Sequence, residues 1–129
     1  MSYPTDLKYT KEHEWIRIDG STATIGITHY AQESLGDIVF VELPKPGTQI
    51  TAGKTFGTVE SVKAVSDLYA PASGTVAEVN GELGTAPEKI NQDANHTWMV
   101  KIKLKDPSEV NALLSAADYE KFVSEEAGH

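Results

Sequence analysis

Hydrophobic and polar residues alternate along much of the chain, which is the pattern of β-strands with one buried face. Residues 14–18 (EWIRI) and 21–27 (STATIGI) alternate in this way, and Asp19-Gly20 between them is a strong hairpin signal. Further short strands are predicted at residues 37–43, 48–50, 55–61, 64–71, 73–80 and 97–104, the last with Trp98, Val100, Ile102 and Leu104 on one face. Strands this short and evenly spaced are typical of a sandwich or barrel.

Helical spacing is found in a short internal segment and near the C-terminus. Residues 28–36 (THYAQESLG) predict a short helix that Thr28 caps and Gly36 ends. Residues 82–96 predict a loop that can hold a helical turn. Asp106-Pro107 with Glu109 predicts a helix over 107–114. Ser115 with Asp118 predicts another over 116–126, with Tyr119, Phe122 and Val123 on one side.

Composition narrows the possible functions. The 129 residues predict one mostly β domain over residues 1–129, with a C-terminal helical segment at about 107–126. A net charge of −8 argues against nucleic acid as a partner, because an acidic surface repels phosphates. No apolar run approaches the roughly 18 residues of a membrane span, so we expect no membrane partner. The first residues resemble neither a signal nor a transit peptide. We therefore expect a cytoplasmic protein, or a mitochondrial matrix protein if a transit peptide has been removed.

Candidate chemistry is sparse. The chain has no cysteine, which excludes disulfides, thiolate metal sites and cysteine nucleophiles. The histidines are far apart and fit no zinc template. The segment GTQITAGKT has one residue too many between its glycines for a phosphate-binding loop. The sequence therefore predicts no catalytic residue and no metal site.

One lysine lies where the strand pattern requires a reversal. Residues 57–70 are about twice as long as an ordinary strand, so the chain should fold back within Ser61-Val62-Lys63-Ala64. That tetrapeptide has no Gly, Pro, Asn or Asp, and we therefore expect a turn without turn chemistry. Small neighbours would leave Lys63 open to an enzyme that acylates its amine, turning the side chain into the base of a long arm.

The residues around Lys63 resemble a known family. GTVESVKAVSDLYAPASGTV is similar to the lipoyl-attachment hairpin of glycine cleavage system H proteins. LKYTKEHEWIRI, ATIGITHYAQESLGDIVFVELP and the closing LLSAADYEKF also resemble that family, in order and spacing. The resemblance implies a lipoyl-domain-like barrel-sandwich hybrid, with the lipoyl hairpin at about 54–70.

The resemblance also implies site residues. Lys63 would carry lipoate, covalently bound as lipoyllysine. Glu60, Gly47 and Gly74 resemble positions that lipoylating enzymes read, with Val62 and Ala64 flanking the lysine. Structural explanations remain open for each of them, since the glycines can serve only to make turns. Glu14 and Asp67 resemble acidic residues of a cleft that receives the loaded arm, although both can equally be solvated carboxylates.

The implied function is that of a non-catalytic, monomeric carrier. A pyridoxal-phosphate glycine decarboxylase would load an aminomethyl group onto the arm, and a tetrahydrofolate-dependent aminomethyltransferase would unload it. Dihydrolipoyl dehydrogenase would reoxidise the dithiol, and a lipoate ligase or lipoyl transferase would attach the lipoate. The absence of cysteine is consistent with this, because no thiol of the chain can exchange with the dithiolane.

Other functions remain open from the sequence. Lipoyl domains of 2-oxo acid dehydrogenase systems typically have Asp-Lys-Ala at this position, and biotin carriers place the lysine between methionines. Neither pattern is present here. An unmodified β-domain used for protein contacts is a further possibility. A lipoate-relay protein, which hands lipoyl groups on to other lipoyl domains, would share the same chemistry.

Overall fold

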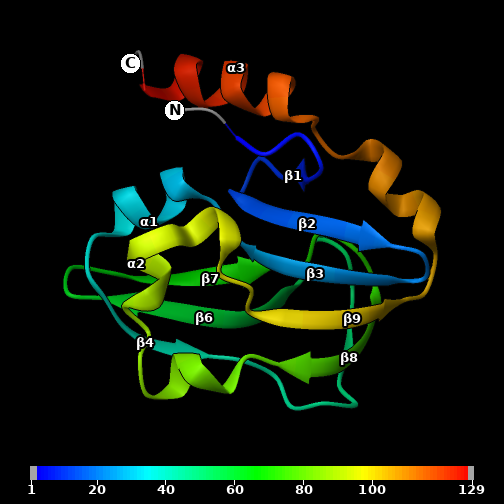
Figure 1. Ribbon diagram of the computed structural model, residues 1–129, viewed down its shortest axis with the longest axis horizontal. Coiled ribbons are helices and arrows are strands. Elements are labelled where there is room, and N and C mark those ends of the chain that lie inside the picture. Colours follow the sequence, from blue (N-terminus) through cyan, green and yellow to red (C-terminus); the bar gives the residue numbers. More distant parts are fainter. Residues whose placement is uncertain (1–2, 128–129) are drawn as a thin grey trace.

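The computed structural model describes residues 3–127 (Figure 1). The predicted strands and helices follow one another in the expected order, and further elements lie between them. The strands are β1 (Lys8–Tyr9), β2 (Glu14–Asp19), β3 (Thr22–Ile27), β4 (Ile38–Glu42), β5 (Gln49–Ile50), β6 (Thr55–Ser61), β7 (Val65–Tyr69), β8 (Gly74–Val79) and β9 (Val100–Leu104). The α-helices are α1 (His29–Leu35), α2 (Lys89–Asp93) and α3 (Ala116–Ala127), and the 3₁₀-helices are η1 (Gly81–Gly84), η2 (Ala94–His96) and η3 (Pro107–Ala112).

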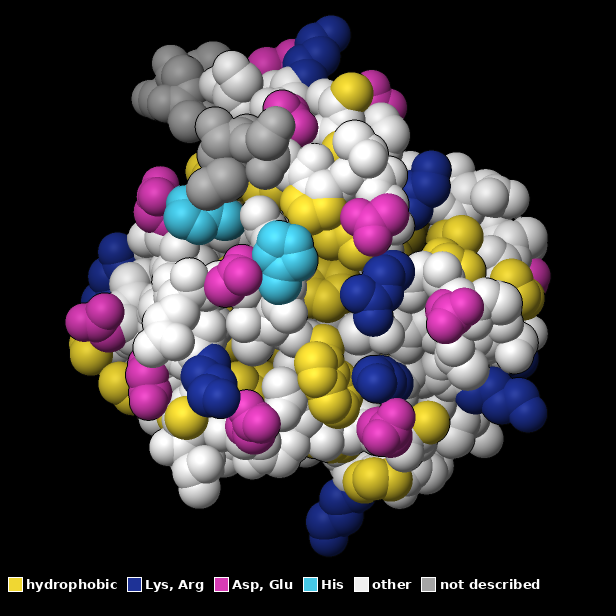
Figure 2. Space-filling view, viewed as in Figure 1, with side chains coloured by type: hydrophobic (Ala, Val, Ile, Leu, Met, Phe, Trp, Pro, Cys, Tyr) yellow, Lys and Arg dark blue, Asp and Glu magenta, His cyan; other side chains and the backbone are white. Residues whose placement is uncertain are grey.

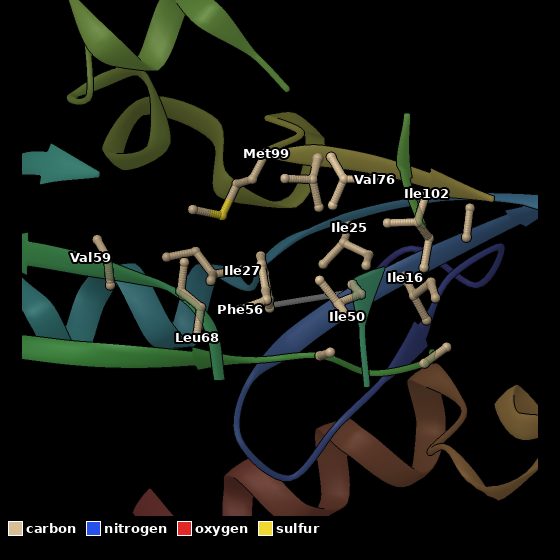
Figure 3. Packing of buried hydrophobic residues seen from close by; sticks show 14 of the residues in the cluster. Ile16, Ile25, Ile27, Ile50, Phe56, Val59, Leu68, Val76, Met99 and Ile102 are labelled. Atoms are coloured by element: carbon tan, nitrogen blue, oxygen red, sulfur yellow. The ribbon is translucent and has the colours of Figure 1, made fainter. Parts of the chain in front are cut away.

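Two antiparallel sheets enclose the main core. One has six strands in the order β1-β2-β3-β9-β8-β5, and the other has three in the order β4-β6-β7. Figure 3 shows Phe56, Val59 and Leu68 of the smaller sheet pointing toward Ile25 and Met99, which lie on and beside the larger sheet. Burial of these apolar side chains is the main source of stability in such a fold. The prediction of a mostly β, barrel-sandwich architecture is confirmed.

The local signals act as predicted in the first half of the chain. Gly20 has a φ of 65° at the β2–β3 hairpin, where Asp19 pairs with Thr22. The Thr28 side chain accepts a hydrogen bond from the Ala31 amide at 3.2 Å and caps α1. Gly36 ends that helix with a φ of 81°. Each of these signals acts within a few residues, which is why the pattern alone predicts it.

Several predicted boundaries differ from the structure. The segment 82–96 holds η1, α2 and η2, where only one turn was expected. The helix predicted over 107–114 is the 3₁₀-helix η3, and Asp106 caps it by accepting from the Ser108 amide at 3.1 Å. The last strand begins at Val100, so Trp98 lies outside it. Trp98 packs against a separate aromatic cluster, whereas Val100, Ile102 and Leu104 lie in the main core.

That aromatic cluster attaches the C-terminal helix to the sheet. Its buried members are Tyr3, Leu7, Tyr9, Trp15, Ala116 and Tyr119. The rings of Tyr9 and Tyr119 stack with centroids 4.7 Å apart, and Tyr3 meets Tyr119 edge-on at 5.0 Å. Phe122 and Val123 pack against the cluster, so the predicted apolar side of α3 is confirmed. The strand β1, which the pattern did not predict, forms a bridge between Tyr9 and Leu114.

Candidate functional site

Lys63 lies at the tip of the hairpin formed by β6 and β7. Strand β6 ends at Ser61 and β7 begins at Val65, so the chain reverses within the predicted tetrapeptide. Val62, Lys63 and Ala64 are all exposed. In Figure 1 this tip projects at the left edge of the molecule, beside the segment that joins α1 to β4. The amine is therefore presented to solvent on a short turn between two paired strands.

Ser61 supplies turn chemistry that we did not expect. Its Oγ, on a side chain buried in the hairpin, accepts hydrogen bonds from the amides of Lys63 at 3.3 Å and Ala64 at 3.1 Å. The Ser61 amide donates to the carbonyl of Ala64 at 2.8 Å. Serine hydroxyls stabilise turns in this way, by replacing a backbone acceptor. The expectation of a turn without turn chemistry is therefore wrong, because the Ser61 hydroxyl supplies the acceptor that stabilises the turn in the absence of Gly, Pro, Asn or Asp.

The tip is also braced by the junction between α1 and β4. The Val62 amide donates to the carbonyl of Asp37 at 3.0 Å. The Cε of Lys63 lies 3.6 Å from the position that a Cβ at residue 36 would occupy, so the lysine stem runs along Gly36. Asn91 holds the junction from the other side: its Nδ2 donates to the Gly36 carbonyl at 2.8 Å and its Oδ1 accepts from the Ile38 amide at 2.9 Å. No sequence motif identified Asn91, because its contacts come from a segment distant in the chain.

The predicted recognition residues separate into two places. Glu60 is exposed on the outward face of β6, opposite Val65, and belongs to the hairpin. Gly74 is instead the first residue of β8, opposite Ile50 of β5, and Gly47 lies shortly before β5 in the six-stranded sheet. The Gly47 amide donates to the Val76 carbonyl at 2.7 Å. The structure thus brings the two glycine segments together, away from the strands that carry Lys63.

The two glycines have different structural roles. Gly47 is exposed with a φ of 93°, a backbone conformation that glycine adopts readily. Gly74 is buried, and a Cβ there would overlap the carbonyl oxygen of Lys103 on the neighbouring strand. Close strand approach is thus sufficient to explain Gly74. A role for either glycine in enzyme recognition stays a prediction.

Glu14 lies in a cleft of about 520 Å³ and is 2% exposed. The cleft is lined by Thr10, Glu12, Glu14, Ala52, Gly53, Tyr69, Ala70, Pro71, Glu109, Ala112 and Leu113. The Thr10 hydroxyl donates to the Glu14 carboxylate at 2.6 Å, and the Tyr69 amide donates to it at 3.1 Å. Burial raises the pKa of Glu14 to about 7, against the opposing effect of these hydrogen bonds. The carboxyl can therefore change charge near neutral pH.

Asp67 is not among the residues that line this cleft. It is exposed on β7, opposite Thr58 of β6. Because side chains alternate along a strand, Asp67 shares its face with Tyr69, whose amide binds Glu14. The two predicted acidic residues are therefore linked through β7 and do not share one pocket lining.

Other kinds of site are not found in the part of the chain that the structure describes. Within residues 3–127 no three His, Asp or Glu side chains are grouped to hold a metal ion. No described helix is both long and apolar enough to cross a membrane.

Comparisons with known proteins identify the family. The family described as "Glycine cleavage H-protein" matches residues 7–126. Two relatives named "Glycine cleavage system H protein" span the full length of both chains: that of Koribacter versatilis (strain Ellin345) is 69% identical, and that of Acidobacterium capsulatum is 65% identical. A crystal structure of a glycine cleavage system H protein from Mycobacterium marinum is 40% identical, with a TM-score of 0.84 over 98% of this chain and 99% of that one. The chain described here therefore belongs to the glycine cleavage H-protein family.

Proposed function

We propose that this protein carries lipoate as an amide on Lys63 and serves as the non-catalytic carrier of the glycine cleavage system. The observation that carries the proposal is an exposed lysine on a braced hairpin tip, in a chain of the H-protein family. The lysine that carries a long arm must be accessible to partner enzymes, and its turn must hold it away from the rest of the protein surface. The Ser61 and Asp37 hydrogen bonds meet the second requirement, and the exposure of residues 62–64 meets the first.

The residues at the tip fit acylation. Attack by the unprotonated Nζ of Lys63 on the carbonyl carbon of an activated lipoyl group forms the amide, expels the activating group and releases a proton. The neighbours Val62 and Ala64 have no polar side-chain group that could form a hydrogen bond with the lysine amine. Among the described residues, no carboxylate forms an ion pair with Lys63 that would hold its amine back.

When bound, lipoate would supply a disulfide that accepts a one-carbon unit and electrons. The chain's own residues would orient and shelter it. Glu14 is 2% exposed in its cleft, and the two oxygens of its carboxylate already accept hydrogen bonds from Thr10 and Tyr69. An ionised Glu14 there would attract a cationic group through a charge-assisted hydrogen bond. Asp67, exposed on the same strand as Tyr69, adds negative charge outside the cleft.

We propose that the partners are those of the family's pathway. They are the pyridoxal-phosphate glycine decarboxylase, the tetrahydrofolate-dependent aminomethyltransferase, dihydrolipoyl dehydrogenase, and a lipoate ligase or lipoyl transferase that reads Glu60. We further propose a monomer in the cytoplasm. The full-length match to relatives named glycine cleavage system H protein supports the proposed partners, because chains that are similar over their whole length present similar surfaces.

The test compares two lysines of one hairpin. Wild-type protein, Lys63→Arg and Lys54→Arg are incubated with lipoate, ATP and a lipoate ligase, and their intact masses are measured. Lys54 is exposed just before β6 and serves as the matched control. We expect one lipoyl increment on the wild type and on Lys54→Arg, and none on Lys63→Arg. Full glycine cleavage by Lys63→Arg in a reconstituted system would overturn the proposal.

A further inference from the structure

All the large hydrophobic side chains that are exposed in the described part of the chain lie around the Lys63 tip. Val62 and Val65 flank the tip and are 69% and 65% exposed, and Val39 and Phe40 on the adjoining strand β4 are 50% and 51% exposed. Single exposed hydrophobic residues are common, but their concentration in one place marks an interaction surface. On the face shown in Figure 2, acidic and basic side chains lie next to one another, without a large surface of one sign.

A β-bulge in β4 turns Phe40 outward. Ile38 pairs with Ser61 and Phe40 pairs with Glu60, so two steps along β4 match one step along β6. Regular alternation after the buried Ile38 would direct Phe40 into the core. Val39 is the extra residue of the bulge, and it shifts the alternation of side chains by one position. As a result Val39 and Phe40 are both exposed, and Val41 is the next buried residue. Bulges of this kind re-aim side chains next to functional sites.

The register defines the composition of the outer face of the β4-β6-β7 sheet. Phe40, Glu60 and Val65 lie opposite one another in the row nearest Lys63. Glu42, Thr58 and Asp67 form the next outward row. None of the three carboxylates of the two rows, Glu42, Glu60 and Asp67, forms an ion pair within residues 3–127. The face thus combines apolar contacts beside the lysine with unneutralised negative charge, and we call these two rows the outer face.

We infer that the outer face is the docking surface for the enzyme that acylates Lys63, and that this enzyme presents an apolar contact bordered by lysine or arginine. The inference rests on the proposed function. An acylating enzyme must bring its active site to the lysine Nζ itself, so its surface must press on the residues beside Lys63. An enzyme that acts at the far end of a long arm has no such requirement.

Charge decides among other occupants. A second copy of this chain would place Glu42, Glu60 and Asp67 against identical carboxylates, which repel each other. An anionic membrane surface would be repelled for the same reason. A partner with a basic surface is attracted to this face. The carboxylates steer its approach, and they fix its orientation over the apolar row.

The experiment measures kcat/KM for acylation by a lipoate ligase, with lipoate and ATP, on four proteins. These are the wild type, Phe40→Ser, Glu42→Lys, and Glu125→Lys as a charge-matched control on the exposed surface of α3. We expect kcat/KM to fall about tenfold or more in the two outer-face variants and to stay within about twofold in the control. Added salt should slow acylation of the wild type more than that of Glu42→Lys. Thermal unfolding checks that each variant is folded, and Glu42 is an exposed residue outside the buried core.

Each outcome separates this inference from the proposed function. If the wild type is acylated on Lys63 and both outer-face variants match the control, the docking inference is overturned while the proposed function stands. If the wild type is not acylated on Lys63, the proposed function fails and the inference fails with it. Self-association of the wild type that Phe40→Ser abolishes, seen by sedimentation, would assign the face to a second copy and also overturn the inference.

Discussion

Glu14→Gln should remove a pH dependence from the stability of this fold. Glu14 is buried at the bottom of a cleft, and its folded-state pKa of about 7 lies above the ordinary value of 4.5. The folded protein therefore holds a proton on this carboxyl that the unfolded chain releases. The stabilisation of the fold by this bound proton is complete below about pH 4.5, and it is lost as the pH rises through about 7.

The size of this stability change follows from how far the pKa of Glu14 is raised on folding. A pKa raised from 4.5 to about 7 corresponds to about 3 kcal/mol of unfolding free energy, which is lost between those pH values. Glutamine has the shape of the neutral acid and keeps an oxygen for the Tyr69 amide, but it does not titrate. Relative to the wild type, Glu14→Gln should therefore gain stability progressively from pH 5 to pH 8.

Urea unfolding followed by tryptophan fluorescence measures this directly. Trp15 is the next residue along β2 and is buried, so its emission reports the transition. We expect the difference in unfolding free energy between the two proteins to change by about 2–3 kcal/mol from pH 5 to pH 8. Thr10→Val removes a hydrogen bond that lowers the pKa of Glu14, so it should move the same transition to higher pH. A difference between wild type and Glu14→Gln that does not vary with pH would refute the reasoning.

Three further predictions concern structural contacts. Gly74→Ala should cost about 1–3 kcal/mol, measured by thermal unfolding, because the new methyl group meets the Lys103 carbonyl; an unchanged melting temperature would contradict this. Ser61→Ala should speed hydrogen exchange of the Lys63 and Ala64 amides, seen by NMR, because both lose their acceptor; unaltered exchange would rule out the serine-based turn. Tyr119→Phe should lower the unfolding free energy by about 1–3 kcal/mol in urea, because its hydroxyl contacts His13 Nδ1 at 2.8 Å and Thr28 Oγ1 at 2.7 Å; a neutral effect would mean that water replaces it.

Elements that depend on neighbouring residues could be predicted from the sequence. The Asp19-Gly20 turn and the Thr28 cap each act over a few positions, and the structure confirms both. Strand β1 could not be predicted, because two residues carry no periodicity and its Tyr9 is held by Leu114 from the far end of the chain.

The site shows the same division. The reversal at Lys63 follows from the length of the strand pattern, and the structure confirms it. The support of Asn91 for the α1–β4 junction could not be predicted, because it depends on long-range hydrogen bonds. The exposure of Phe40 depends on a bulge, which alternation alone does not reveal. Resemblance to a family supplied the candidate roles of Glu14 and Asp67, but only the folded structure shows that Glu14 is buried and Asp67 exposed.

The brace beneath the hairpin tip affects how often a tethered group meets its partners. The hydrogen bond between the Val62 amide and the Asp37 carbonyl restrains the backbone next to Lys63, and therefore the point from which any arm on that lysine extends. The free end of a tether samples a smaller volume when its attachment point is restrained than when that point is mobile. Confinement raises the effective concentration of the free end at a docked active site, without any added contact. The contact between the hairpin tip and the α1–β4 junction would in this way raise the rate at which a group carried on Lys63 meets a docked enzyme.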